Sequence, residues 1–525
     1  MNRRIYNITF HLHTISSILI SLALYVIFFA GSFSFFRDEI VNWERGHTVV
    51  TQDKIEANID TLLAALDTSY NLHGRDFTFN LYYNERRVSV SLTGSKDSTA
   101  TEEDQVGAFF YLDTEDHHMS SYAESYGLGE FLYRLHFFAQ IPYPYGYYLS
   151  GFMAFLLLFV ILTGLIVHWD KIVSNFFVFR PKAKWKTIWT DSHTALGLIG
   201  FPFQLVFALT GAFFMLKALL VAPFMLALYD GDSEQFNKDL EYDSPTYAFS
   251  YQQMESVPKL SPYFEETQSN WPAFNIHTVN IYNYGDENMH LGFQGSLSHQ
   301  EKLNGIGEII YSVRDGSIAH QKDPFPNNSY LDVVKNMLYR LHLADYAGLG
   351  LRLISFLLGL LSCYVVLSGV MIWLVARNKK MTSEREKRFN QRVVWWYLAI
   401  CLGMYPMTAI EFSLVKLFPG GGMIFLYRTF FLGWLGLSLC LMWTKRNTSI
   451  LRWSLILGGI FGALIPIING VTTGQWIWYS WAYGLDQILF IDLFWLVLSA
   501  LSFITAFKLK KTEHQEKQPI LRQAI

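Results

Sequence analysis

The sequence predicts an α-helical integral membrane protein with about eight transmembrane helices, a duplicated four-helix core and two small α+β domains outside the membrane. Three observations predict this class. Only 16% of the 525 residues are charged, where a soluble protein averages about 25%. Several charge-free runs are near the length of about 20 apolar residues that crosses a bilayer. Two long acidic segments with strand-like alternation interrupt these runs. A soluble enzyme is therefore excluded.

Hydropathy places the spans near residues 8–36, 147–169, 193–216, 353–376, 393–411, 424–443, 454–472 and 487–507. The first span is too long for a signal peptide and lacks a small-residue cleavage site, so we expect it to remain a helix. The net charge of −3 averages oppositely biased regions, and no nucleic-acid partner is expected. All three cysteines lie in apolar runs, which excludes a disulfide framework and a C-x-x-C-H haem attachment.

Every second connection between spans is basic, which predicts that both termini are cytoplasmic. Lys and Arg cluster before the first span and after the second, fourth, sixth and eighth, as in the run of seven from Arg377 to Arg392. Two long segments then face the other side. Arg37 to Arg134 holds 18 acidic and 8 basic residues, and Lys217 to Arg352 holds 17 and 9.

The expected division of the chain has eight parts. They are a first transmembrane helix (1–36), a periplasmic domain (37–146), helices two and three with a basic loop (147–216), a second periplasmic domain (217–350), a fourth helix (351–376), a basic cytoplasmic linker (377–392), a four-helix C-terminal membrane bundle (393–507) and a cytoplasmic tail (508–525).

The first half of the chain is a duplicated unit of helix, outside domain and helix. The pentapeptide LYRLH occurs at residues 132–136 and 338–342, each time just before an even-numbered span. Gly164 follows the first copy's histidine by 28 residues, and Gly369 follows the second by 27. The odd spans match as well, since a glycine lies 18 residues after His13 and after His193. Both units run in the same direction, which predicts a pseudo-two-fold axis along the membrane normal.

Five histidines lie near the ends of these spans, and histidine is the commonest metal ligand. His13, His168 and His193 lie toward the predicted cytoplasmic ends, and His136 and His342 lie at the predicted outer face. An up-down bundle of parallel units puts spans one and three on one diagonal and spans two and four on the other. This arrangement suits two non-covalent, b-type haems with paired imidazole ligands. His136 and His342 would hold the outer haem, and His13 and His193 the inner one.

Small residues in the spans, such as Gly31, Gly164, Gly211 and Gly369, would let a flat macrocycle approach the backbone. Interfacial histidines usually meet lipid headgroups or cap helices, so the repeat is what favours ligation.

Other features have plainer interpretations. His168 has no counterpart in the second unit, so it is either the second inner ligand or a residue beside the point where electrons enter. His11 is turned about 100° from His13 on a helix and is taken as structural. Asp191 or Ser192 is expected to cap the third span. The outside histidines are expected to be solvated loop residues: His117, His118, His277, His290, His299 and His320.

At these residues the sequence resembles the PepSY-associated transmembrane family, and within it bacterial members likened to inner-membrane di-haem ferric-siderophore reductases. The motifs that carry the resemblance are FHLHTISSILISLALYVIFFAGSFSFFRDEI (10–40), LYRLHFFAQIPYPYGYY (132–148), TGLIVHWDKIVSNFFVFRP (163–181), DSHTALGLIGFPFQLVFALTG (191–211) and LYRLHLADYAGLGLRLISFLLGLLSCYVVLSGVMIW (338–373). The family's histidines fall here on His13, His136, His168, His193 and His342. Relatives often carry histidine where this chain has Gln204, so that position offers no imidazole.

The resemblance implies two PepSY-like periplasmic domains and electron transfer through two haems across the bacterial inner membrane. The acceptor would be a ferric siderophore or another ferric chelate. The sequence has no Rossmann fingerprint, so the donor would be a separate cytoplasmic reductase or a membrane quinol. Two alternatives remain open. The chain could be a PepSY-type regulator that binds an envelope partner without redox activity, or a siderophore permease. Glu411 and Asp492 near predicted span ends argue against the permease, because transporters place polar groups at mid-membrane.

Overall fold

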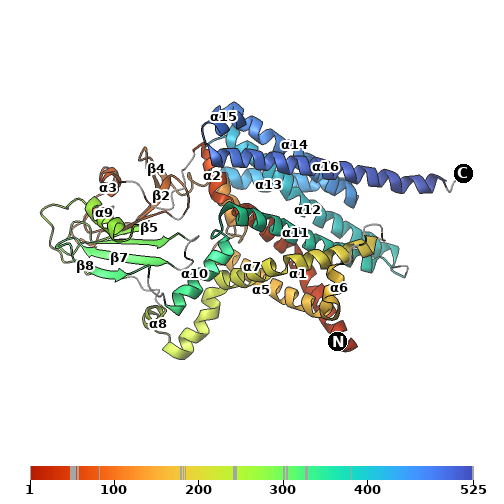
Figure 1. Cartoon of the computed structure of the whole chain (residues 1–525), viewed down its shortest axis with the longest axis horizontal. Helices are drawn as coiled ribbons and strands as arrows, with labels where there is room; N and C mark the ends of the chain where they lie inside the picture. Colours follow the sequence, from red (N-terminus) through yellow and green to blue (C-terminus); the bar gives the residue numbers. More distant parts are fainter. Residues whose placement is uncertain are drawn as a thin grey trace. The chain divides into compact units, whose positions relative to one another are not determined.

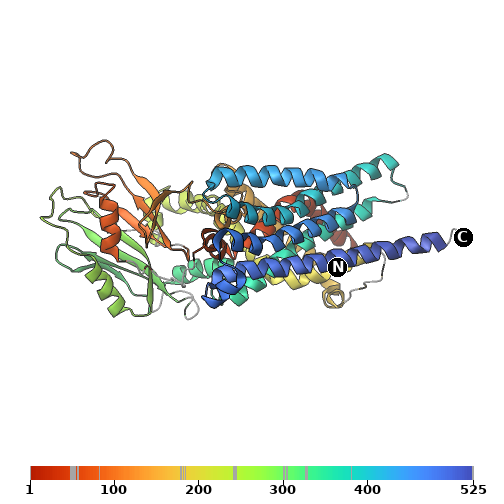
Figure 2. The same ribbon diagram turned by 90° about the horizontal axis from the view of Figure 1, so that it is seen from above.

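The computed structural model describes residues 2–47, 55, 58–81, 83–177, 180, 183, 185–240, 245–298, 302, 305–325, 329–379 and 381–522. The chain forms two compact units. The helical unit comprises residues 1–48, 127–220 and 352–525, and the sheet unit comprises residues 49–126 and 221–351. Each unit is therefore built from segments that are distant in the sequence (Figures 1 and 2).

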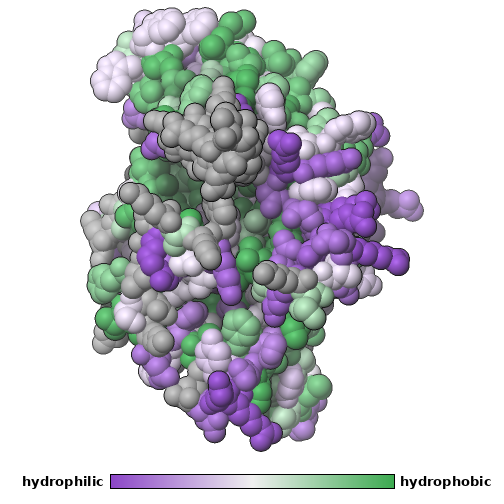
Figure 3. Space-filling model, turned by 90° about the vertical axis from the view of Figure 1, so that its right-hand side faces the viewer, coloured by the Kyte–Doolittle hydropathy of each residue, from purple (hydrophilic) through white to green (hydrophobic). Residues whose placement is uncertain are grey.

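Eight helices in the described residues are long and apolar enough to cross a membrane, which confirms the predicted spans. They are α1 (Arg3–Ser34), α5 (Tyr145–His168), α7 (Trp185–Tyr229), α11 (Gly348–Arg377), α12 (Glu384–Leu417), α13 (Gly422–Trp443), α14 (Asn447–Thr473) and α16 (Asp486–Arg522). Both chain ends lie toward the same end of the helical unit in the two ribbon views, as an even number of spans requires. Figure 3 looks onto this end, where hydrophilic side chains gather.

Two expected span boundaries were wrong. The helix α7 already begins at Trp185, so Asp191 lies inside it and caps nothing. Its carboxylate instead accepts hydrogen bonds from the Arg180 guanidinium, with Nη2 2.9 Å from Oδ1. The helix α12 begins at Glu384, where Ser383 and Glu386 form a capping box. Much of the expected basic linker is therefore the first turns of α12, because this capping box precedes the apolar run.

Shorter helices connect the spans. They are α2 (Arg37–Arg45), α3 (Ile59–Asp67), α4 (Leu128–Leu135), α6 (Ile172–Phe176), α8 (Ser233–Asp239), α9 (Ser261–Asn270), α10 (Tyr330–Leu343), α15 (Ile477–Ala482) and the 3₁₀ turn η1 (Trp169–Lys171). The two LYRLH copies lie at the C-terminal ends of α4 and α10. The pentapeptide therefore ends a short helix in both copies of the sequence repeat.

The expectation of two separate outside domains was wrong, because both segments build one eight-stranded antiparallel sheet. The strands are β1 (Phe77–Asn80), β2 (Arg87–Leu92), β3 (Ala108–Asp113), β4 (Met119–Ser121), β5 (Phe274–Tyr282), β6 (His290–Leu297), β7 (Ile306–Ser312) and β8 (Ile318–Lys322). Their order is β4-β3-β2-β1-β5-β6-β7-β8. Each half is a four-stranded meander, and the equivalent strands β1 and β5 pair in the middle, where Phe79 lies opposite Val279.

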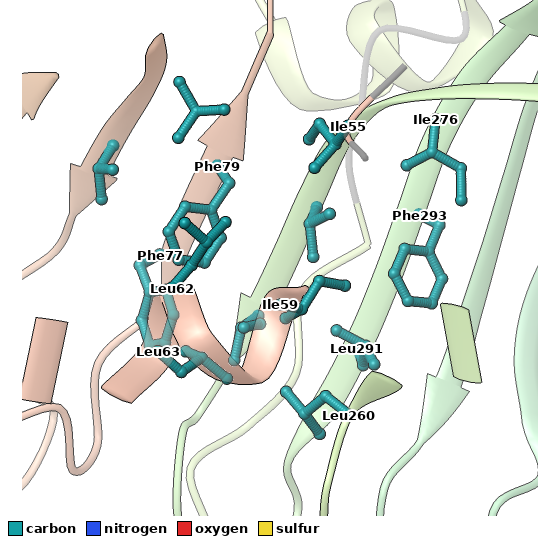
Figure 4. Packing of buried hydrophobic residues seen from close by; sticks show 14 of the residues in the cluster. Ile55, Ile59, Leu62, Leu63, Phe77, Phe79, Leu260, Ile276, Leu291 and Phe293 are labelled. Atoms are coloured by element: carbon teal, nitrogen blue, oxygen red, sulfur yellow. The ribbon is translucent and has the colours of Figure 1, made fainter. Parts of the chain in front are cut away.

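The sheet has one hydrophobic core, to which both halves contribute (Figure 4). Phe77 and Phe79 of β1 lie with Ile276 of β5 and Phe293 of β6 in the same buried cluster. The helix α3 covers the core with Leu62, which is fully buried. An isolated half would have left this apolar face and a strand edge exposed, which explains why the halves merge.

This shared core predicts that the two halves lose stability together. Replacing Phe79 by alanine removes a side chain with 0% exposure and should cost about 3–5 kcal/mol. Hydrogen exchange of the whole protein should then show faster exchange at β6 and β7 as well as at β1 and β2. Tyr330→Ala, at a side chain that is 81% exposed, should change neither half. Faster exchange confined to residues 58–126 would mean that the halves fold independently.

Candidate functional site

The His13 side chain of α1 is fixed by the neighbouring helix α5. Its Nδ1 lies 3.0 Å from the backbone oxygen of Val160. A carbonyl oxygen can only accept, so Nδ1 carries the proton and donates it. Gly164 lies one turn further along α5, and a Cβ at that position would be 3.0 Å from the imidazole Cε1. The missing side chain therefore makes room for the ring against the α5 backbone.

The His193 side chain of α7 repeats this arrangement against α11. Its Nδ1 lies 3.0 Å from the Val365 carbonyl oxygen and 3.0 Å from the Ser368 hydroxyl. A Cβ at Gly369 would be 3.3 Å from the imidazole Cε1. The duplication seen in the sequence is therefore also a duplication of hydrogen bonds.

His136 directly follows α4, and its side chain makes the same kind of contact with a carbonyl and a glycine of α1. Its Nδ1 lies 2.8 Å from the Ile27 carbonyl oxygen, and a Cβ at Gly31 would be only 2.5 Å from that nitrogen. In all three cases the accepting carbonyl lies four residues before the glycine. His342, at the end of α10, belongs to the sheet unit.

The glycines thus serve a different purpose from the one expected. At Gly31, Gly164 and Gly369 the space is taken by an imidazole ring of the chain itself. From the sequence we expected a macrocycle in this space. The spacing of the glycines can be read from the sequence, but the side chain that packs against each glycine cannot.

Residues from His13 to Gly369 hold both copies of this arrangement, and the sequence profile of the PepSY-associated TM region matches residues 10–376. The chain belongs to this family. No curated protein shows significant similarity to the chain. The matched region ends before α12, so the C-terminal bundle (α12, α13, α14, α15 and α16) lies outside the PepSY-associated region.

Within the PepSY-associated region, His13 and His193 lie close together. Their ring centroids are 6.4 Å apart and the ring planes are at 76°. Two imidazole nitrogens held about 2 Å on either side of one metal ion would put the centroids about 6.3 Å apart. Because both Nδ1 atoms donate to carbonyl oxygens, Nε2 is the nitrogen through which each ring would coordinate a metal. The centroid separation of the pair is therefore the one expected for two imidazoles that bind one metal ion from two sides.

His168 lies at the C-terminal end of α5 and is partly buried. It is close enough to His13 and His193 to interact electrostatically with both. Three of the five candidate histidines therefore gather at one end of the helical unit. His11 is exposed, and its structural role stays a prediction.

The interpretation of the outside histidines as loop residues was wrong for three of them. His277 lies on β5 with Nε2 2.8 Å from the Ser296 hydroxyl. His290 lies on β6 and stacks on Tyr247 at 3.6 Å between centroids, and His320 lies on β8. His117 and His118 do lie between β3 and β4, and His299 falls outside the described residues.

These strand positions predict acid sensitivity of the sheet unit. Burial, together with the positive charge of Arg340, lowers the pKa of His277 to about 4. The unfolded chain, with a pKa near about 6.5, binds the proton first. The folded state therefore loses up to about 3 kcal/mol as the pH falls from about 6.5 to about 4. Thermal unfolding at several pH values should show this loss, and His277→Gln should flatten it. An unchanged slope in that variant would assign the sensitivity to other groups.

Sequence reasoning missed a set of buried charges in the C-terminal bundle. Glu411 and Asp492 are 0% exposed and Lys416 is 5% exposed. The Asp492 carboxylate accepts hydrogen bonds from Trp43 Nε1 at 2.9 Å and Asn469 Nδ2 at 3.0 Å. Glu411 and Asp492 do lie within two turns of a helix end. Both are nevertheless buried, and this weakens the argument that their position excludes a transporter. The signal that could have shown it is that ionisable residues within membrane spans almost always face the interior of the bundle.

Proposed function

We propose that this protein transfers electrons across the bacterial inner membrane through two b-type haems and reduces ferric iron, as a ferric siderophore or another ferric chelate, during iron uptake. The observation that carries the proposal is the His13 and His193 pair, with ring centroids 6.4 Å apart and both Nδ1 atoms bound to backbone carbonyls. Bis-imidazole ligation of haem requires this separation and this tautomer.

The ligand count also supports haem over a bare metal ion. Among the described residues, no group of three or more His, Cys, Asp or Glu side chains could hold a metal. Two imidazoles alone would leave an ion short of ligands, whereas a porphyrin supplies four nitrogens of its own. His13 and His193 would be the axial ligands of the inner haem, and His168 would lie beside it.

The outer haem is proposed from the sequence repeat. His136 and His342 are the corresponding residues of the two LYRLH copies. The hydrogen bond from His136 Nδ1 to the Ile27 carbonyl supports a ligand role, since it fixes the tautomer in which Nε2 would coordinate.

The direction of transfer follows from the basic connections, which we assign to the cytoplasm together with both termini. A cytoplasmic reductase or a membrane quinol would supply electrons, and the ferric chelate would accept them on the periplasmic side. Bound haem supplies one-electron redox chemistry. The chain holds the imidazoles, sets their tautomer and surrounds them with apolar helices. One electron releases the metal, because hard oxygen donors hold Fe(III) more tightly than Fe(II).

The visible spectrum of the purified protein tests this proposal. Expression with a haem precursor should give a Soret band, with separate α and β bands after reduction, at two haems per chain. A colourless protein obtained under these conditions would overturn it.

A siderophore permease is the second candidate, because Glu411, Lys416 and Asp492 are buried in helices that the histidine repeat does not use. Transporters place ionisable groups at such positions. A permease would move an intact ferric chelate into vesicles without reducing it, so the oxidation state of the recovered iron separates the two functions.

A further inference from the structure

We infer that the C-terminal bundle positions His136, and that Asp492 acts in this as a positioning residue through α2. The inference rests on the proposed function, since it concerns one of the proposed haem ligands. Its physical basis is a continuous set of buried contacts from the bundle to the helix that ends at His136.

The first step joins the bundle to α2. Asp492 of α16 accepts a hydrogen bond from the indole of Trp43, which is 0% exposed. Lys416 of α12 donates to the Trp43 carbonyl, and its ammonium lies 4.5 Å from the centre of the indole ring. Gln487 accepts from Asn42 at 2.8 Å. The short helix α2 is therefore held by two helices of the bundle at once.

The second step joins α2 to α4. The guanidinium of Arg37 donates from Nε and Nη2 to Glu130 Oε2, at 3.2 and 3.0 Å. The carboxylate of Glu44 accepts from the backbone N–H of Leu128, at 2.7 Å. Gly129 lets the two helices touch, because a Cβ there would lie 2.4 Å from the Arg37 carbonyl oxygen. Polar contacts at both ends and a glycine between them fix α4 against α2.

The third step joins α4 directly to the bundle and to the imidazole. Phe131 is 0% exposed, and its ring centroid lies 4.8 Å from that of Phe430 on α13. Glu130 also binds Arg134 Nε at 2.7 Å. Two residues later comes His136, whose ring is held by the Ile27 carbonyl. A shift of α4 would therefore move this ring away from its carbonyl.

The bundle also packs on α11, where Val370 lies in a buried apolar cluster with Val394 and Leu398 of α12. Neither Asp492 nor α2 is part of the described contacts that hold the inner histidines. The carbonyls that hold them belong to Val160 of α5 and Val365 of α11, and both helices lie in the PepSY-associated region. Loss of Asp492 should consequently affect one haem much more than the other. This loss should act on His136 in particular, because it removes the carboxylate that accepts from the buried Trp43 indole and one of the two carboxylates near the Lys416 ammonium.

The test uses the purified full-length holoprotein with Asp492→Ala. A haem that keeps two imidazoles has no position for carbon monoxide, and a haem that loses one does. We expect one of the two reduced haems to bind carbon monoxide in Asp492→Ala and its midpoint potential to shift. The other haem should keep the parent values. His136→Ala identifies which redox component belongs to His136.

Three further variants complete the experiment. Asp492→Asn keeps an oxygen that can accept from Trp43, so it should restore most of the parent behaviour. Ser454→Ala is the matched control, because it removes a buried hydrogen bond within the bundle, to the Leu402 carbonyl, and touches neither α2 nor α4. Phe430→Leu tests the direct contact and decides the question should Asp492→Ala fail to fold.

Parent-like carbon monoxide binding and potentials in the folded variants of Asp492 and Phe430 would overturn the inference. Equal changes in both haems would also overturn it, since they would indicate a general loss of stability. A parent protein that binds no haem would instead overturn the proposed function, so the two failures are distinguishable.

Discussion

Replacing His193 by alanine is expected to lower the haem content from two per chain to one and to stop electron transfer across the membrane. The variant removes one of the two imidazoles whose centroids are 6.4 Å apart. The nearest imidazole that could replace it is His168, which lies in electrostatic range of the pair. Haem extracted from the purified variant and measured against protein concentration gives the stoichiometry.

His11→Ala is the matched control for this variant. It removes an exposed histidine two residues from His13 on the same helix, and it should keep both haems. A His193→Ala protein that still held two haems would show that His13 pairs with another residue. The double variant His168→Ala and His193→Ala would then reveal whether His168 is that residue.

Adding a methyl group at the glycines is expected to displace the imidazoles in a defined order. A Cβ would lie 2.5 Å from the His136 ring at Gly31, 3.0 Å from the His13 ring at Gly164 and 3.3 Å from the His193 ring at Gly369. Overpacking of this kind costs about 1–3 kcal/mol. Gly31→Ala should therefore lose the most haem, Gly164→Ala less and Gly369→Ala least. Haem content and unfolding temperature measure the series.

Gly436→Ala controls for the general effect of alanine in a helix. Apart from the neighbouring backbone of α13, no atom of the described residues lies within 4 Å of a Cβ at that position, and alanine favours a helix over glycine by about 1 kcal/mol. It should be neutral or slightly stabilising. Equal effects at all four glycines would contradict the role of the first three as space for imidazole rings.

Much of the helical unit could be predicted because its signals are local. Hydropathy locates all eight spans, since a membrane helix must be predominantly apolar along its length. The repeat of His13 and Gly31 in His193 and Gly211 also appears in the sequence, because each pair lies on one helix at a fixed spacing. The proximity of His13 and His193 followed from the parallel repeat, and the structure confirms it.

The remaining features depend on contacts between distant segments. The pairing of β1 with β5 joins residues about 200 positions apart, so two acidic segments looked like two domains. The helix α2 was missed because its polar residues resemble a loop until their partners on α4, α12 and α16 are known. The Nδ1 hydrogen bonds of the histidines were invisible for the same reason, although the glycines that permit them had been found.

Electron transfer across a sealed bilayer tests the central claim most directly. Vesicles that contain the purified protein would hold an impermeant reductant inside, with a ferric chelate and a chromophore specific for ferrous iron outside. The proposed function predicts rapid appearance of ferrous iron outside, much slower appearance with His193→Ala, and parent rates with His11→Ala. Ferrous iron forming no faster than in vesicles without protein would contradict it.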